Sequence, residues 1–131
     1  FDEWVESNGT TITMAAPYNT YNISVTALSA SNYILSGTDR NGSVSGNDPT
    51  VTVIAGDTIN FNISASGHPF YIKTVYVGGS GSQVSTGTIT GTQGTTNSTL
   101  SWNTSGVSAG TYYYVCSPHA SFGMGGSIVV T

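Results

Sequence analysis

Hydrophobic and polar residues alternate along several short segments of the chain. From Tyr21 to Ala27, apolar side chains occupy the odd positions, and Asn, Ser and Thr occupy the even ones. Successive side chains of a β-strand point to opposite faces, so this period of two predicts a strand with one buried face. The segments Val51–Ile54 and Ile59–Ile63 repeat the pattern on either side of Ala55–Asp57. They predict two neighbouring strands joined by a corner or tight turn.

Other short apolar runs are separated by turns rich in Gly, Ser, Asn and Asp. No helical periodicity competes strongly with them. Short, regularly spaced strands of this kind are typical of a sandwich or barrel, so the predicted fold class is all-β. The further strands are expected at Tyr33–Leu35, Phe70–Val77, Thr99–Trp102, Thr111–Cys116 and Ser127–Val130.

Two segments depart from this pattern. Residues 78–96 are poor in apolar side chains and rich in Gly, Ser and Thr, which predicts a loop or a weak hairpin through Gly87–Gly91. Residues 1–20 precede the first clear strand, and we expect an N-terminal extension or edge strand there, followed by one domain at 21–131. In that first segment, Trp4, Val5, Ile12 and Met14 either add an edge strand, cover the sandwich or belong to a linker.

The composition narrows the classes of partner. A chain of 131 residues is most simply one domain. Only 6% of its residues are charged, against about 25% in an average protein, and the formal net charge is −4 with Arg40 and Lys73 as the only cations. A nucleic acid or an anionic membrane surface attracts basic proteins, so neither is an expected partner. No stretch approaches the roughly 20 apolar residues of a membrane span.

The only Cys and both His residues of the chain form one candidate constellation together with a Met. These residues are His68, Cys116, His119 and Met124. Thiolate and thioether sulfur favour Cu(I) and imidazole suits both oxidation states, so a His2Cys plane with a weak axial Met is the ligand set of a blue (type 1) copper ion. Cys116, His119 and Met124 share one short loop, whereas His68 lies 48 positions before Cys116. The site therefore closes only if the fold brings two distant strands together.

Simpler interpretations of these residues explain each one but not their coincidence. A lone buried Cys is usually a small hydrophobe, and Met is ordinarily core filler. Structural zinc prefers four Cys or His ligands, and haem attachment through two thiols needs a second Cys. A Cys116 nucleophile paired with a His remains conceivable, but no oxyanion donor or orienting carboxylate is identifiable nearby. One copper ion cycling between Cu(I) and Cu(II) is the expected cofactor.

Two segments resemble the plastocyanin-like cupredoxins. Gly110–Thr131, GTYYYVCSPHASFGMGGSIVVT, is similar to the last two strands of that family with its Cys-x2-His-x4-Met pattern, and Asp57–Thr74, DTINFNISASGHPFYIKT, resembles the part that supplies the first His. The resemblance implies a Greek-key cupredoxin β-sandwich. It also implies that the copper ligands are His68, Cys116, His119 and Met124, with His119 at the surface as the port for electrons.

The chain departs from the family pattern at two places. In plastocyanins the residue after the first His is typically Asn, whose backbone N–H points at the Cys sulfur, but here it is Pro69, which has no N–H. A hydrogen bond that tunes the site is therefore expected to be missing. In addition, Met124 is flanked by Gly123, Gly125 and Gly126, which permit many backbone conformations. This leaves open whether Met124 binds copper or leaves a coordination position free.

Three functions follow from these observations. The leading hypothesis is a one-electron carrier that docks redox protein partners through an apolar patch near His119, formed with Pro69, Pro118 and Phe122. The alternative is an enzymatic copper site with an open position for a small molecule, such as nitric oxide oxidised to nitrite. The third hypothesis is a copper-storage protein or a structural domain of a surface assembly.

An extracytoplasmic location, either periplasmic, secreted or at the cell surface, is expected. Low Lys content and a lone Cys that copper would occupy fit such a location, because a spare thiol is exposed to disulfide pairing there. The chain begins Phe1-Asp2-Glu3-Trp4 without a basic and apolar leader, which suggests a mature form whose signal sequence has been removed.

Overall fold

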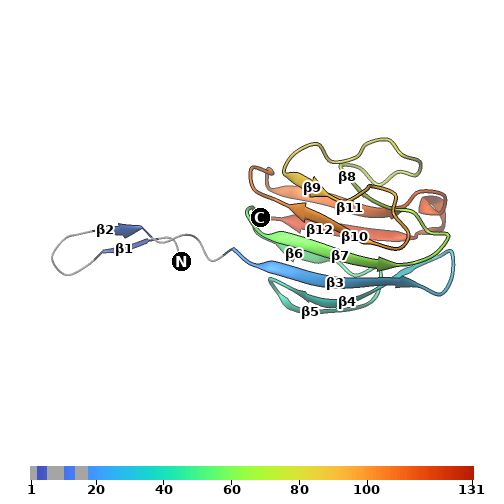
Figure 1. The fold of residues 1–131 in the computed structure, drawn as a ribbon, viewed down its shortest axis with the longest axis horizontal. Coiled ribbons are helices and arrows are strands. Elements are labelled where there is room, and N and C mark those ends of the chain that lie inside the picture. Colours follow the sequence, from blue (N-terminus) through green and yellow to red (C-terminus); the bar gives the residue numbers. More distant parts are fainter. Residues whose placement is uncertain (1–2, 6–10, 14–17) are drawn as a thin grey trace.

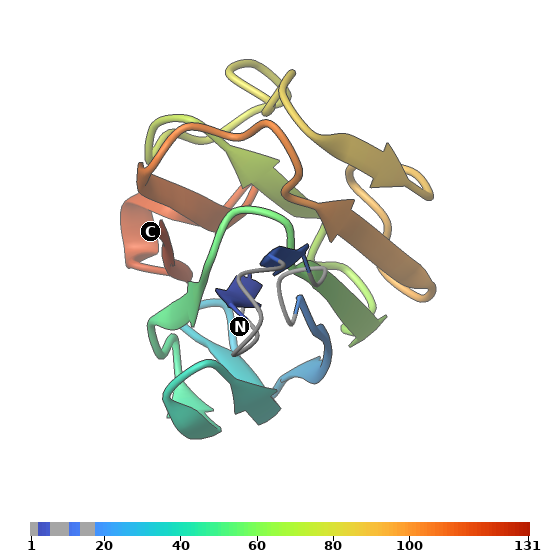
Figure 2. The same cartoon turned by 90° about the vertical axis from the view of Figure 1, so that its left-hand side faces the viewer.

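The alternating segments form the strands of two facing β-sheets (Figures 1 and 2). A computed structural model describes residues 3–5, 11–13 and 18–131, the first two ranges by their backbone alone. One sheet has six strands, in the order β5 (Gly42–Asn47), β4 (Tyr33–Asp39), β3 (Thr20–Ala27), β7 (Thr58–Ser64), β10 (Thr99–Asn103) and β9 (Thr88–Thr90). The other has four strands, in the order β6 (Val51–Val53), β12 (Gly125–Val130), β11 (Gly110–Cys116) and β8 (Phe70–Lys73). The all-β sandwich expected from the sequence is thereby confirmed.

Two pairings are parallel, β3 with β7 and β6 with β12, and the remaining pairings are antiparallel. The strands β1 (Glu3–Val5) and β2 (Thr11–Thr13) pair with each other. Met14, one of the residues for which the sequence suggested an edge strand or a cover, lies outside the described residues. The division at residue 20 stays a prediction.

The core lies between the inner faces of the two sheets. On β3 the odd residues Tyr21, Ile23 and Val25 are buried and the even ones are exposed, as the alternation predicts. Tyr33, Phe61, Phe70 and Tyr114 form an aromatic cluster whose ring centroids are 5.0–6.3 Å apart. Burial of such rings contributes about 1.5–3 kcal/mol each, so this cluster fixes how the two sheets pack.

The turn at Ala55–Asp57 is a corner, because β6 and β7 belong to different sheets. Hydrogen bonds hold this corner against Thr131 and against Thr104, the residue that follows β10. The Ala55 N–H donates to the Thr131 carbonyl at 3.0 Å, and the Gly56 N–H donates to the Thr104 hydroxyl at 3.1 Å. The corner lies at the beginning of β7, whereas His68 follows the end of that strand.

Three local expectations were incomplete or wrong. Strand β4 extends beyond Leu35 to Asp39, and β5 was not foreseen, because Val44 is its only buried residue. The predicted strand Phe70–Val77 ends at Lys73. Beyond it Val75, Tyr76 and Val77 are 50%, 39% and 43% exposed, because the chain leaves the sheet edge. The loop at 78–96 contains the short edge strand β9, which pairs with β10.

Candidate metal centre

The pairing of β8 with β11 brings the two distant parts of the site together. Cys116 is the last residue of β11 and pairs with Phe70 at the start of β8. His68 precedes β8 by two residues, in a tight turn where its N–H donates to the Ala65 carbonyl at 2.9 Å. Gly67 takes a positive φ of 82° in that turn, which a glycine adopts without strain. The register of one strand pair therefore places His68 beside Cys116.

The segment between β11 and β12 is folded tightly by backbone hydrogen bonds. The His119 N–H donates to the Cys116 carbonyl at 3.1 Å, and a 3₁₀ turn η1 (Ala120–Phe122) follows. Gly123 ends that turn in the left-handed region. The Met124 N–H then donates to the His119 carbonyl at 3.3 Å, and its carbonyl accepts from the Cys116 N–H at 3.0 Å. Cys116, His119 and Met124 are thus tied to one another through the backbone.

Three donor atoms face one another at spacings that suit a metal ion. The Nδ1 atoms of His68 and His119 are 3.2 Å apart, and the Cys116 Sγ lies 3.7 Å from the first and 3.4 Å from the second. The point equidistant from these atoms is about 2.0 Å from each, close to the roughly 2.0–2.3 Å that nitrogen and sulfur ligands keep from a zinc ion. Among the described residues these are the one group of His, Cys and acidic side chains close enough to share an ion.

The surroundings of His68 favour its neutral form, which is the form that binds a metal, whereas Cys116 binds a metal as the thiolate. Burial lowers the pKa of the His68 imidazole, and the neighbouring His119 lowers it further. Burial raises the pKa of the Cys116 thiol, while hydrogen bonds from Tyr33 and from the His119 backbone act in the opposite direction. Because a soft anionic sulfur between two imidazoles suits copper, the donor set fits that metal.

Met124 is fully buried in the core, and its backbone lies against both Cys116 and His119. All four residues predicted for the site therefore occupy the same end of the sandwich. Pro69 meets the site through its carbonyl, which accepts from the Ser117 N–H at 3.1 Å.

Sequence analysis missed one residue of this site, namely Tyr33. Its hydroxyl donates to the His68 carbonyl at 2.8 Å. The sequence offered Tyr33 only as a strand residue. Nothing in its local pattern points to the site, because it lies 35 positions before His68 and the fold alone brings them together.

Comparison with known families decides the class of the protein. The family described as copper-binding proteins of the plastocyanin/azurin family matches residues 33–131. The chain belongs to this family. Together with the His-Cys-His group, this makes the cupredoxin a type 1 copper protein that binds one copper ion and acts as an electron carrier.

Solved structures of rusticyanin have a similar fold. A crystal structure of rusticyanin variants is 25% identical, with a TM-score of 0.55 over 86% of this cupredoxin and 77% of that chain. The structure of a second rusticyanin variant is 22% identical in sequence, with a TM-score of 0.56, and the match covers 90% of this cupredoxin and 84% of that chain. The structure of rusticyanin from Thiobacillus ferrooxidans is 24% identical in sequence, with a TM-score of 0.53, and the match covers 86% of this cupredoxin and 77% of that chain. No curated protein matched the chain.

An electron carrier exchanges electrons with redox protein partners, so part of the surface must serve as an interface. In the part of the chain that the structure describes, no helix is long and apolar enough to cross a membrane.

Proposed function

We propose that the Nδ1 atoms of His68 and His119 and the Sγ of Cys116 bind the copper of this cupredoxin in one plane, with the Met124 sulfur as the axial ligand. The observation that carries this proposal is the spacing of the three donor atoms, none more than 3.7 Å from another. The burial of Met124 supports the axial assignment and a closed site. It favours the electron carrier over the hypothesis of an open position for a small molecule.

The chain's own residues limit how far the ligands move when the charge of the site changes. Bound copper supplies the one-electron chemistry between Cu(II) and Cu(I). Backbone hydrogen bonds within 116–124 hold Cys116, His119 and Met124 in one rigid loop, and the pairing of Cys116 with Phe70 holds His68 nearby. Little rearrangement is then required between the two oxidation states, which favours fast electron exchange.

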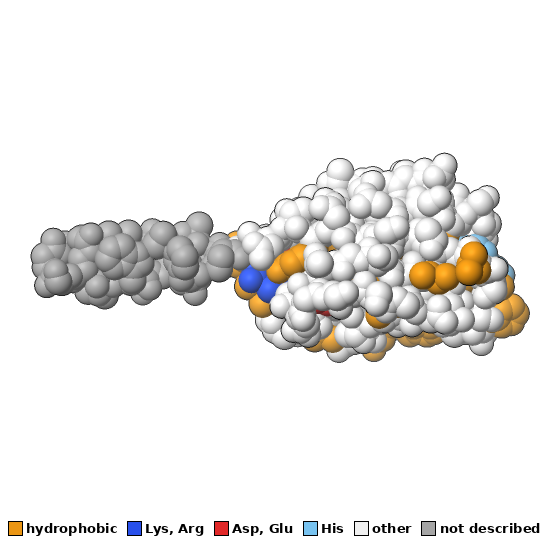
Figure 3. All heavy atoms as spheres, turned by 90° about the horizontal axis from the view of Figure 1, so that it is seen from below, with side chains coloured by type: hydrophobic (Ala, Val, Ile, Leu, Met, Phe, Trp, Pro, Cys, Tyr) orange, Lys and Arg blue, Asp and Glu red, His pale blue; other side chains and the backbone are white. Residues whose placement is uncertain are grey.

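The proposed docking patch surrounds His119 and is made of Pro69, Pro118 and Phe122. The Phe122 ring stacks on the His119 imidazole at 5.5 Å between centroids and is 62% exposed. Figure 3 shows hydrophobic side chains beside the visible His atoms at one end of the sandwich. The imidazoles of His68 and His119 are both partly exposed. An apolar surface beside them suits a redox protein with an apolar surface of its own, because contact between the two surfaces excludes water and brings the two metal centres close.

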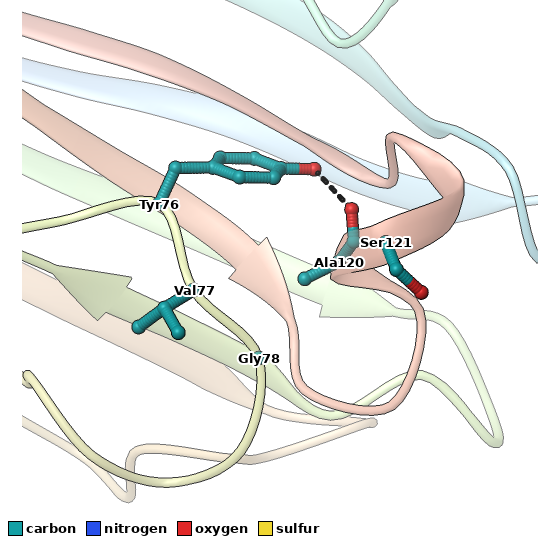
Figure 4. A pocket seen from close by; sticks show the side chains of 5 residues that line it. All are labelled: Tyr76, Val77, Gly78, Ala120 and Ser121. Atoms are coloured by element: carbon teal, nitrogen blue, oxygen red, sulfur yellow. Dashed lines mark hydrogen bonds between the residues drawn. The ribbon is translucent and has the colours of Figure 1, made fainter.

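A depression of about 240 Å³ adjoins this patch between Tyr76, Val77, Gly78, Ala120 and Ser121. In Figure 4 the Tyr76 hydroxyl points at the Ala120 carbonyl, to which it donates at 3.1 Å. We include the exposed segment 75–77 in the proposed interface, because it continues the apolar surface from the ligand loop.

We also propose that the copper domain comprises residues 21–131, that residues 1–20 form an N-terminal extension, and that the protein works outside the cytoplasm. The low Lys content and the single Cys support that location.

Spectroscopy of ligand variants tests the assignment. Loaded with Cu(II), the wild-type protein is expected to show an intense visible thiolate-to-copper band, and Cys116→Ser to lose it completely. Met124→Leu is expected to keep the band and to raise the reduction potential, because removing an axial donor favours Cu(I). Met14→Leu, at the only other methionine, is the matched control and should change neither property. A Cys116→Ser variant that keeps the band would refute the ligand set.

A further inference from the structure

Two hydrogen bonds fix the backbone of His68, one at its N–H and one at its carbonyl. The N–H donates to the Ala65 carbonyl at 2.9 Å, and the carbonyl accepts from the Tyr33 hydroxyl at 2.8 Å. The residues just before it, Ser66 and Gly67, are exposed. The first bond is local, whereas the second spans 35 positions and ties the His68 turn to β4.

Tyr33 is itself a rigid support. Its N–H donates to the Asp48 carboxylate at 2.8 Å, and its carbonyl accepts from the Asp48 N–H at 2.8 Å. Its ring is fully buried, packs edge-on against Phe70 at 5.2 Å and lies 6.3 Å from the Tyr114 ring. Because side chains in so closely packed an interior have little room to move, the hydroxyl offers His68 a fixed point.

Asp48 has a backbone conformation that is uncommon for a residue other than glycine. Its φ of 47° lies in the left-handed region, which Asp tolerates better than bulky residues but which still costs energy. Such conformations persist where the surrounding structure requires them, and they cluster at functional sites. Here the strained residue binds both backbone groups of Tyr33, so it connects through Tyr33 to the turn of a proposed copper ligand.

His68 is the proposed ligand that lies outside the rigid loop 116–124. Backbone hydrogen bonds within that loop hold Cys116, His119 and Met124 relative to one another. The imidazole of His68 reaches the shared point only while its own turn keeps its conformation. A site without copper is ready for the ion only in the fraction of molecules that have His68 in place, and the apparent affinity falls in proportion to that fraction.

We propose that Tyr33 is a positioning residue that holds His68 in its metal-binding place before copper binds. This inference rests on the proposed function, since it requires His68 as a ligand. The hydroxyl acts on the copper-free protein, where no metal bond holds the imidazole. Bound copper fixes His68 by itself, so loss of the hydroxyl lowers the affinities for Cu(I) and Cu(II) by the same factor. The reduction potential depends on the ratio of the two affinities and therefore stays unchanged.

Tyr33→Phe tests the proposal, because it removes the hydroxyl and keeps the ring. From the net strength of one neutral hydrogen bond, we expect the dissociation constants for Cu(I) and Cu(II), measured by competition with chelators, to rise between about threefold and tenfold. The thiolate-to-copper band and the reduction potential should match those of the wild type. In the copper-free variant, amide hydrogen exchange should become faster at His68 and stay unchanged at His119, whose N–H bond lies within the ligand loop.

Tyr112→Phe is the matched control, because it removes a hydroxyl-to-carbonyl bond of the same length, 2.8 Å to Ser108, at the other end of β11. It should leave both dissociation constants and the exchange at His68 unchanged. If Tyr33→Phe also leaves them unchanged, Tyr33 does not position His68. If it weakens binding of only one oxidation state and so shifts the potential, Tyr33 acts on the bound copper and the proposal is wrong. Wild-type affinity in His68→Ala would instead refute the ligand assignment.

Discussion

Asp57 is a fully buried carboxylate that the surrounding donors keep ionised. Arg40 donates to it from two nitrogens at 2.9 and 2.8 Å, and the backbone N–H groups of Asn19 and Ile54 add two bonds of 2.9 Å. Burial alone raises the pKa of Asp57, but the bonds from Arg40 and the backbone outweigh it, so the pKa lies below its ordinary value. This residue ties the linker before β3 to the corner before β7.

The lowered pKa of Asp57 makes stability depend on pH in a defined direction. Its contribution is complete above the unfolded-state pKa of about 3.9 and disappears as the pH falls through the lower folded-state value. Asp57→Asn should lower the free energy of unfolding by about 2–4 kcal/mol at pH 7. This is less than the ~3–5 kcal/mol expected when one partner of a fully buried ion pair is removed, because Arg40 reaches solvent.

Urea denaturation of the copper-free protein at pH 7 and pH 3 measures this effect. The variant is expected to lose less stability than wild type between the two pH values. Asp39→Asn, which removes a second buried carboxylate that accepts from the N–H groups of Asn41 and Thr52, serves as the comparison. An equal loss on acidification in wild type and Asp57→Asn would contradict the prediction.

At the scale of elements, Lys73 ends β8 and anchors the segment after it. Its ammonium group is fully buried and donates to the carbonyls of Val77, Gly78 and Gly79 at 2.8, 3.1 and 2.6 Å. The Gly79 N–H in turn donates to the Ser117 carbonyl at 3.0 Å, inside the ligand loop. One side chain thus connects β8, the depression in Figure 4 and the Cys116–His119 turn.

Lys73→Met should release this segment. Three carbonyls lose their donor, so we expect the free energy of unfolding to fall by about 1–3 kcal/mol. We also expect faster amide exchange at residues 75–79 and faster release of copper. Hydrogen exchange and copper transfer to a chelator measure these changes. Arg40→Met, at the only other cation of the chain, should lower stability without affecting exchange at 75–79. Unchanged exchange in Lys73→Met would show that the segment is held by other contacts.

The same residue explains why sequence analysis placed the end of β8 too late. The alternation and apolar content of Phe70–Val77 resemble a strand, but the bonds from Lys73 turn the chain away at residue 74, and such bonds have no sequence pattern. Strand β5 escaped notice because an edge strand with Val44 as its only buried residue has no hydrophobic period. The proximity of His68, Cys116 and His119 could be predicted, because the only Cys and both His are rare residue types at informative spacing. The position of Tyr33 could not, since only the packing of one sheet on the other brings its hydroxyl to the His68 carbonyl.

At the scale of the whole molecule, the sandwich has almost no free charge. Three of the six acidic residues lie among the first six positions, so residues 18–131 contain two cations and three carboxylates. Among these, Asp39, Asp57 and Lys73 are at most 7% exposed, and Arg40 pairs with Asp57. Long-range steering depends on the summed charge of a surface, and the proposed docking patch contributes none.

Electron exchange with a partner protein should therefore depend only weakly on salt. Between 10 mM and 500 mM salt the Debye length falls from about 30 Å to a few Å, yet we expect the bimolecular rate constant from stopped-flow absorbance to change by less than about twofold. Ser121→Glu places a charge at the depression beside the ligand loop and should create a clear salt dependence with a charged partner. Ser105→Glu, at the opposite end of the sandwich near Asp57, should create much less. A steep salt dependence in the wild-type protein would show that docking uses charged residues outside the proposed patch.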